Sequence, residues 1–225
     1  MKPVLIVGAG IGGISTALAL AANGLDSLVL EARQEHSMVD RGDILQPSTL
    51  PLLQRWGVNE HICDSSRLTF HTFQMLDAAG GQLFVADTSR ILPSPLPFTS
   101  IRHADLLTAA RGAARATGKV TMHFGQRAVE ILDEDGAVCG VRTASDEFRS
   151  PITVFATGGT SSLCDGIFGR PSIHHYRSAF HNLRVPQFSD NNDAASYVVG
   201  SDGTLVFVPL PNNEQRIGLQ VPLSA

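Results

Sequence analysis

VLIVGAGIGGISTALALAANG, residues 4–24, is an uncharged stretch that fits two very different kinds of protein. About 20 apolar residues are enough to cross a bilayer, and Lys2 just before them is typical of a secretion signal. Glycines at positions 8, 10, 12 and 13 argue against both readings, because each costs a helix about 1 kcal/mol relative to alanine. We therefore expect neither a signal peptide nor a membrane span.

The same stretch divides into a strand, a turn and a helix. Residues 4–7 form a short apolar run, as in a buried parallel strand. From Ile14 onward apolar and small residues recur at helical spacing, and Gly24 stands where a helix commonly ends. The turn between them reads GxGxxG over positions 8–13, which is the pattern of a dinucleotide-binding turn.

Each glycine of this turn has a physical role. Gly8 permits a tight turn, Gly10 lets a pyrophosphate approach the backbone, and Gly13 lets the helix pack closely on the sheet. The phosphates then meet free N–H groups and the positive end of the helix dipole. Glu31 ends the next apolar run, 18 residues after Gly13, where a carboxylate can accept the ribose hydroxyls. A carboxylate there would repel a 2′-phosphate, so NADP is disfavoured at this turn.

Composition narrows the class of protein. A chain of 225 residues that is 43% hydrophobic suits one large domain or one and a half. The net charge of −4 predicts no nucleic-acid partner. Three widely spaced cysteines without a CxxC motif, and eight scattered histidines, predict neither a disulfide framework nor a metal site. This cysteine usage fits a cytoplasmic protein.

The rest of the chain mixes helices with strands of two kinds. Prolines at 47 and 51 suit the opening of a helix, and residues 104–117 form an alanine-rich helix that ends at a glycine. The proline-rich residues 91–98 read as a connection. Strands are expected at 68–76, 82–85, 120–124, 129–132, 137–142, 152–156, 197–199, 205–209 and 216–221.

The order of these motifs resembles the N-terminal half of FAD-dependent aromatic monooxygenases of the para-hydroxybenzoate hydroxylase type. The resemblance runs through nearly all 225 residues and covers somewhat over half of a typical family member. Its carriers are the glycines at 8–13, Glu31, Arg41, Arg102 at the start of IRHADLL, the segment FATGGTSS at 155–162, and QVPLS at 220–224.

The resemblance implies an α/β fold. It would be a Rossmann-like FAD-binding domain of the glutathione-reductase type with an incomplete β-rich substrate domain. We assign residues 1–66 and 99–170 to the FAD-binding domain and residues 67–98 and 171–225 to the partial substrate-binding sheet. The implied activity is monooxygenation, in which FAD is the cofactor, NAD(P)H the co-substrate and O₂ the source of the oxygen that hydroxylates an aromatic or similar small organic substrate.

The resemblance also places residues beside the cofactor. Arg41 is expected to reach the FAD diphosphate, and Arg102 to lie beside the pyrophosphate or flavin, where a cation offsets phosphate charge. No residue is assigned as catalytic; His71 is the one candidate, and an exposed strand histidine is the commoner reading. The expected cofactor-binding residues are Gly8, Ala9, Gly10, Ile11, Gly12, Gly13, Glu31, Ala32, Arg33, Arg41, Arg102 and Gly158.

Two departures from the family pattern keep alternatives open. Thr157 stands where the second fingerprint has aspartate, and Cys164 where it has arginine. The third fingerprint, a glycine-aspartate segment, does not occur before Ala225. The alternative is a non-catalytic FAD- or dinucleotide-binding module, or half of a split enzyme completed by a C-terminal polypeptide. A third functional alternative is another flavoprotein of the same fold, a halogenase or a lipid reductase. As a partner, a second copy of the chain in a homo-oligomer is also possible.

Overall fold

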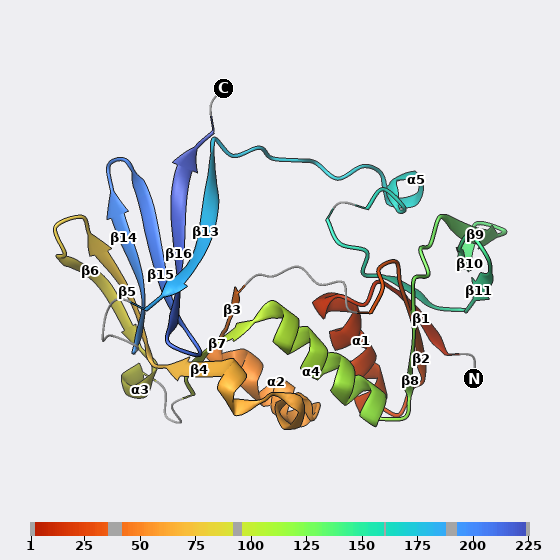
Figure 1. The fold of residues 1–225 in the computed structure, drawn as a ribbon. Coiled ribbons are helices and arrows are strands. Elements are labelled where there is room, and N and C mark those ends of the chain that lie inside the picture. Colours follow the sequence, from red (N-terminus) through yellow and green to blue (C-terminus); the bar gives the residue numbers. More distant parts are fainter. Residues whose placement is uncertain (1–2, 36–41, 92–95, 160, 188–192, 224–225) are drawn as a thin grey trace. The chain divides into compact units, whose positions relative to one another are not determined.

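The computed structural model describes residues 3–35, 42–91, 96–159, 161–187 and 193–223 (Figure 1). The chain packs into two compact units, each built from segments that are distant in sequence. The first comprises Met1–Val39, Arg55–His61 and Leu107–Ile173, and the second comprises Asp40–Gln54, Ile62–Leu106 and His174–Ala225.

A parallel sheet is the centre of the first unit. Its strands run in the order β12 (Thr153–Phe155), β1 (Val4–Val7), β2 (Ser27–Glu31) and β8 (Val120–Phe124). Every neighbouring pair is parallel. Helix α1 (Ile11–Ala22) connects β1 to β2 and contacts both. This βαβ arrangement confirms the expected α/β fold.

Burial explains why residues 4–24 fold in this way. Leu5, Ile6 and Val7 of β1 are all buried, as expected of a parallel strand that is covered on both faces. Along α1 the buried positions are 13, 14, 17 and 18, which is one face of a helix. Gly24 has a φ of +77°, so the helix ends at a residue that tolerates left-handed backbone. The apolar stretch is therefore a strand, a turn and an amphipathic helix.

A small antiparallel sheet belongs to the same unit. Strands β9 (Glu130–Glu134), β10 (Ala137–Arg142) and β11 (Glu147–Arg149) pair in the order β11-β10-β9. Asp135 and Gly136 join β9 to β10 with φ values of 55° and 82°, as the Asp-Gly pair predicts. The inward-facing Val141 is fully buried in a cluster with Leu5, Val7 and Leu30.

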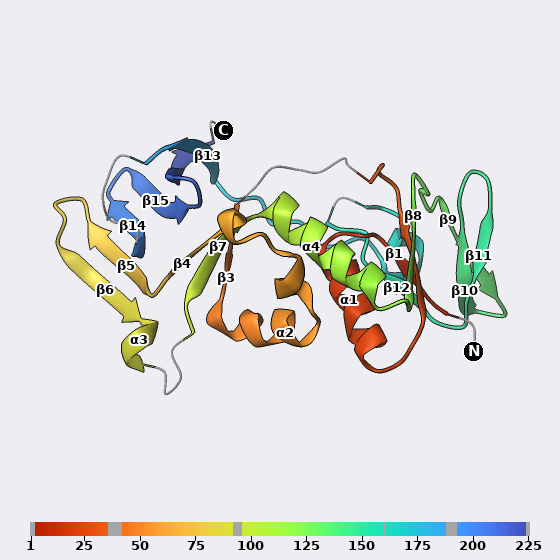
Figure 2. The ribbon, with the colours of Figure 1, turned by 60° about the horizontal axis from the view of Figure 1, so that its bottom comes forward.

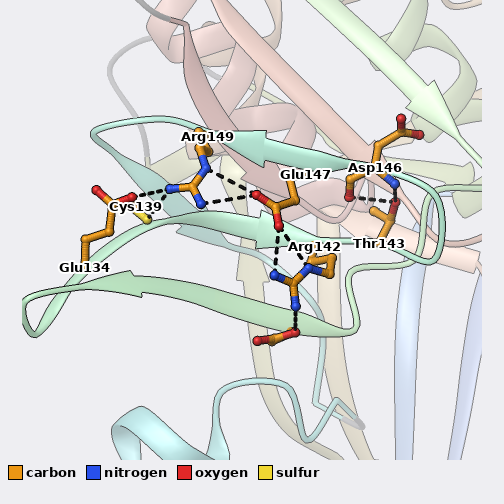
Figure 3. A network of polar contacts seen from close by, with 8 residues as sticks. Glu134, Cys139, Arg142, Thr143, Asp146, Glu147 and Arg149 are labelled. Atoms are coloured by element: carbon orange, nitrogen blue, oxygen red, sulfur yellow. Dashed lines mark hydrogen bonds and ion pairs between the residues drawn. The ribbon is translucent and has the colours of Figure 1, made fainter.

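The outer face of this small sheet carries a network of charges (Figure 3). Glu147 accepts hydrogen bonds from Arg142 at 2.8 and 3.1 Å and from Arg149 at 3.2 and 3.3 Å. Glu130 and Glu134 pair with the far sides of the two arginines. These bonds to Arg142 and Arg149 hold the pKa of the Glu147 carboxyl below its usual value.

The second unit is built from two sheets. The larger has the order β13 (Ser178–Pro186), β16 (Glu214–Pro222), β15 (Gly203–Leu210), β14 (Ala194–Gly200), β5 (Thr72–Asp77) and β6 (Gln82–Asp87). Only the β14–β5 pair among these is parallel. The smaller sheet has the order β3 (Gly42–Leu45), β7 (Phe98–Arg102) and β4 (Arg67–Phe70).

Aromatic packing joins the two sheets of the second unit. Phe70 of β4 stacks on Phe98 of β7 with ring centroids 5.5 Å apart, and both are buried with Ala195 of β14. Phe73 of β5 packs against the same cluster. Figure 2 shows β4 and β7 running beside the end of β5. The core of this unit is therefore β-on-β.

The helices outside α1 are short except for α4 (His103–Ala116), which follows β7 directly. Its residues from Leu107 onward belong to the first unit. The shorter helical elements are Pro47–Thr49, α2 (Leu50–Arg55), Val58–His61, Asp64–Ser66, α3 (Thr88–Ile91) and α5 (Asp165–Phe168).

The expected strands need correction in several places. The strand expected at 68–76 is two strands, β4 and β5, which belong to different sheets and are separated at His71. The His71 carbonyl accepts a bond from the Thr88 amide at 3.0 Å, which anchors the chain where it changes sheet. The proline-rich connection ends in a strand, β7, and the strands β3, β11 and β13 were not expected.

Candidate dinucleotide-binding site

The turn between β1 and α1 is closed by backbone contacts that only glycine allows. Gly8 has a φ of +111°, and a Cβ on it would lie 2.3 Å from the Ala156 carbonyl oxygen. A Cβ on Gly13 would lie 1.8 Å from the Gly8 carbonyl oxygen. The Gly8 amide donates to the Leu30 carbonyl at 2.7 Å. Because glycine has no side chain at these two positions, the start of α1 packs closely on the sheet, as the sequence pattern predicts.

The outer side of the same turn is open. A Cβ on Gly10 or Gly12 would meet no atom within 4 Å among the residues that the structure describes. Gly10 is the N-cap of α1 and provides no side-chain cap, so the first amides of the helix are available to a ligand. An anion is favoured there by these donors and by the helix dipole. The turn therefore fits the diphosphate of a dinucleotide such as FAD.

Glu31 lies against this turn. One carboxylate oxygen accepts the Ala9 amide at 2.8 Å and the other accepts the Arg33 amide at 2.9 Å. Each oxygen retains a further lone pair that can accept a hydroxyl. The structure thus brings Ala9, Glu31 and Arg33 together at the C-terminal edge of the parallel sheet, where a ribose would lie beside the diphosphate.

Arg111 of α4 completes the turn, and the sequence analysis missed it. Its guanidinium donates to the Ala9 carbonyl at 2.9 Å and to the Glu35 carbonyl at 3.0 Å. It also lies over the Phe124 ring, with the guanidinium carbon 5.0 Å from the ring centroid. Burial lowers the pKa of Arg111, and the Glu31 and Glu35 carboxylates act in the opposite direction.

A sequence signal for Arg111 does exist. Leu107, Ala110 and Ala114 form the apolar stripe of α4, and Arg111 falls four residues after Leu107, within that stripe. Arg111 is only 6% exposed. A charged residue on the buried face of a helix requires polar partners, because an unpaired buried charge is very costly.

The remaining expected site residues are placed as follows. Ile11 and Gly12 open α1, and Ala32 follows Glu31 at the end of β2. Gly158, with a φ of +80°, lies in the turn that leaves β12, the strand beside β1. Arg41 lies outside the described residues. Arg102 belongs to the second unit, where it pairs with Asp105 at 3.0 Å, so its expected role beside the cofactor stays a prediction.

Other candidate features are less informative. His71, the single catalytic candidate, has its ring Nδ1 2.9 Å from the hydroxyl of Thr88, a residue that is 3% exposed. A shallow cavity of about 370 Å³ is lined wholly by the second unit, including Arg177, Thr204 and Gln220, and contains no residue of the dinucleotide turn. Among the described helices, none has the length and apolar character needed to cross a membrane.

Residues 1–165 match a protein-family model described as FAD binding domain. The 3-hydroxybenzoate 6-hydroxylase of Polaromonas naphthalenivorans (strain CJ2) is 29% identical over 224 residues, which are 95% of this chain and 54% of that protein. The phenazine 1,6-dicarboxylic acid hydroxylase PhzS of Lysobacter antibioticus is 31% identical over 227 residues, which are 99% of this chain and 54% of that protein. Mouse (Mus musculus) squalene monooxygenase is 24% identical over 228 residues, which are 95% of this chain and 38% of that protein.

Solved structures share the fold. PqsL of P. aeruginosa, in complex with 2-aminobenzoylacetate, superposes with a TM-score of 0.87 at 20% identity, covering 98% of this chain and 60% of PqsL. The tetrameric form of 2-methyl-3-hydroxypyridine-5-carboxylic acid oxygenase gives a TM-score of 0.80 at 21% identity, and the match covers 99% of this chain and 59% of that oxygenase. The chain spans about half the length of the curated aromatic hydroxylases that it matches. It belongs to the FAD-binding-domain family of the FAD-dependent aromatic hydroxylases.

Proposed function

We propose that this chain is the FAD-binding portion of a monooxygenase that uses NAD(P)H and O₂ to hydroxylate a small aromatic acid. The observation that carries the proposal is the open turn at Gly10 and Gly12, beside the Glu31 carboxylate, in a chain of the FAD-binding-domain family. The turn would hold the diphosphate at the start of α1, and Glu31 would hold the adenosine ribose. FAD, when bound, supplies the redox chemistry.

The larger sheet of the second unit supports an aromatic substrate. Phe73 of β5 and Tyr197 of β14 lie on one face of this sheet, with ring centroids 5.1 Å apart. Tyr197 pairs with Val206, and Arg216 pairs with Val208 two residues further along β15. Because side chains alternate between the two faces of a strand, Arg216 lies on the same face as the two rings. That face combines aromatic surface with positive charge.

A second arginine on this face favours an acid as the substrate. Arg184 of β13 is directly opposite Arg216 of β16 in the antiparallel register. Two guanidinium groups on one face can bind a carboxylate through charge-assisted hydrogen bonds. Glu214 pairs with Arg184 at 3.4 Å and offsets part of this charge. Two relatives are named for aromatic acids and one for the hydrocarbon squalene, and the arginines favour the acids.

The test is ligand binding by the purified chain. Saturable quenching of FAD fluorescence, with ADP competing, would support the FAD-binding role, because ADP carries the adenosine and diphosphate alone. 3-Hydroxybenzoate should bind more tightly than the neutral 3-hydroxybenzamide, and Arg216→Met should remove the difference. Arg90→Met, which changes a side chain that is 84% exposed, is the matched charge control. Equal affinity for acid and amide would exclude the acid-binding proposal.

A non-catalytic or split-enzyme module is the second candidate. Thr157 and Cys164 replace the aspartate and arginine expected in the second fingerprint, and this favours the alternative. Oxygen uptake and product formation separate the two candidates. FAD-loaded protein that consumes O₂ and NAD(P)H in step with hydroxylated product supports the monooxygenase. Tight FAD binding without substrate-dependent oxygen uptake supports the module.

A further inference from the structure

We propose that Arg111 is a positioning residue of the dinucleotide site, which sets the orientation of the Ala9 peptide group at the turn. Naming FAD as the ligand rests on the proposed function, but the positioning itself does not. Arg111 is assigned no contact with the cofactor. Its effect would pass through the backbone of the turn, which Gly10 leaves open to the diphosphate.

The Ala9 residue is held from two sides by opposite charges. Its amide donates to the Glu31 carboxylate at 2.8 Å, and its carbonyl accepts from the Arg111 guanidinium at 2.9 Å. Ala9 itself is fully buried, so water does not substitute for either partner. Hydrogen bonds to charged groups are stronger than neutral ones, so this pair defines the direction of the peptide planes on both sides of Ala9.

Arg111 also links the turn to a second loop. Its other terminal nitrogen donates to the carbonyl of Glu35, which follows β2 and Glu31. One guanidinium therefore joins the loop after β1 to the loop after β2, the two loops that would surround the adenosine end of the ligand. A planar group with donors in several fixed directions can make both bonds, whereas a lysine ammonium has no such fixed geometry.

The fold alone does not require an arginine here. Neighbouring positions on the buried side of α4, Ala110 and Ala114, are filled by small apolar residues. Arg111 is equally buried, at 6% exposed, but it carries a charge, and its Nε has no hydrogen-bond partner among the described residues. Burying a cation with one unsatisfied donor is costly. A compensating role at the turn explains why the charge is placed there.

Arg115 provides the matched control. It is one helical turn further along α4, lies 5.9 Å from the same Phe124 ring, and pairs with the Glu35 side chain. Its side chain is 48% exposed and none of the hydrogen bonds described for it reaches Ala9. Arg115→Met therefore removes a similar charge and a similar ring contact without touching the turn.

The first readout is hydrogen–deuterium exchange of residues 8–14 in the ligand-free 225-residue chain. Arg111→Met should speed exchange of the hydrogen-bonded amides among them, those of residues 8, 9 and 14, by about tenfold or more, as expected for losing a hydrogen bond from a charged donor. Arg111→Lys should restore part of the protection. Arg115→Met should leave it within about twofold, a change below that of one hydrogen bond.

The second readout is the affinity for ADP, and a stability control accompanies it. Arg111→Met should weaken ADP binding by about tenfold or more, the same hydrogen-bond loss. Leu132→Ala in β9 truncates a buried side chain of the same unit outside the cluster that contains Val7 and Leu30, and should leave the turn protected relative to the rest of the unit.

Unchanged exchange at residues 8–14 in Arg111→Met would overturn the proposal. So would an equal rise of exchange throughout the first unit in both Arg111→Met and Leu132→Ala, because Arg111 would then only support the fold. Failure of the wild-type chain to bind ADP or FAD would refute the proposed function. The exchange readout would still decide the role of Arg111.

Discussion

Gly13→Ala is the sharpest test of how the turn is built. The new Cβ would lie 1.8 Å from the Gly8 carbonyl oxygen and 3.0 Å from the Gly8 carbonyl carbon. Both are backbone atoms of the turn, so no side chain can rotate away. Even close carbon–oxygen contacts in proteins are about 3.3–3.6 Å, so the start of α1 would have to move by about 1.5 Å.

The cost follows from what such a shift breaks. The Gly8 amide bonds to Leu30 at 2.7 Å, and the Ile14 amide bonds to Gly10 at 3.0 Å. The Ala9 amide bonds to Glu31 at 2.8 Å. Each buried hydrogen bond contributes about 1 kcal/mol, and overpacking adds about 1–3 kcal/mol. We expect Gly13→Ala to lower the free energy of unfolding by about 4–6 kcal/mol, a large share of the roughly 5–15 kcal/mol of a typical domain.

Urea unfolding followed by circular dichroism measures this loss, and Gly12→Ala is the control. Gly12 is one residue away in the same helical turn, and its Cβ would meet nothing within 4 Å among the described residues. Because alanine restricts the unfolded chain more than glycine does, Gly12→Ala should be neutral or stabilise by up to about 1 kcal/mol. Equal unfolding midpoints for Gly13→Ala and the wild type would refute the close packing of α1 on the turn.

Three further outcomes are expected. Gly10→Val should leave the unfolding midpoint nearly unchanged, because Gly10 has an ordinary φ of −74°, but it should abolish FAD binding by filling the diphosphate position; retained affinity in a fluorescence titration would exclude that position. Glu31→Ala should weaken FAD binding by about 1.5–3 kcal/mol, which is the contribution of a charged hydrogen bond. Calorimetry measures this loss of affinity, and an unchanged affinity would contradict the role of Glu31. Hydrogen bonds from Arg142 and Arg149 lower the pKa of Glu147, so its ionised carboxylate stabilises the fold at pH values above its ordinary pKa of 4.5. This contribution is lost as pH falls through the lowered pKa. Acid unfolding of Glu147→Gln should therefore depend less on pH below about 4.5, and parallel curves for variant and wild type would contradict this.

The strand, turn and helix at residues 4–24 were predictable because their causes are local. A glycine at 8 is required by its own φ of +111°, and the DG pair at 135–136 is required by the tight turn that it forms. Hydrophobic spacing alone sets the buried face of α1. Sequence patterns report such features directly, since a backbone φ, a two-residue turn and helical spacing are each set within a few residues.

The course of β4 and β5 was not predictable in the same way. Residues 68–76 are rich in strand-forming residues, which predicts one strand, although the apolar positions change phase from 68 and 70 to 73 and 75. The break at His71 also involves Thr88, which is 17 residues away. The edge strand β13 shows a different reason. It pairs only with β16 and exposes Phe180 and Leu183, so it lacks the clean alternation of a half-buried strand. Tertiary pairing overrides local pattern in both cases.

The dinucleotide turn combines both kinds of determinant. Its glycines make the close packing possible, but its peptide orientation depends on Glu31 and on Arg111, which is 102 residues from Ala9. Both charges bond to the Ala9 backbone, one at its amide and one at its carbonyl. Hydrogen bonds to charged groups are the stronger ones, so these two bonds fix the direction of the peptide groups that a diphosphate would meet. The affinity of this turn thus depends on a buried helix position that the GxGxxG pattern does not contain.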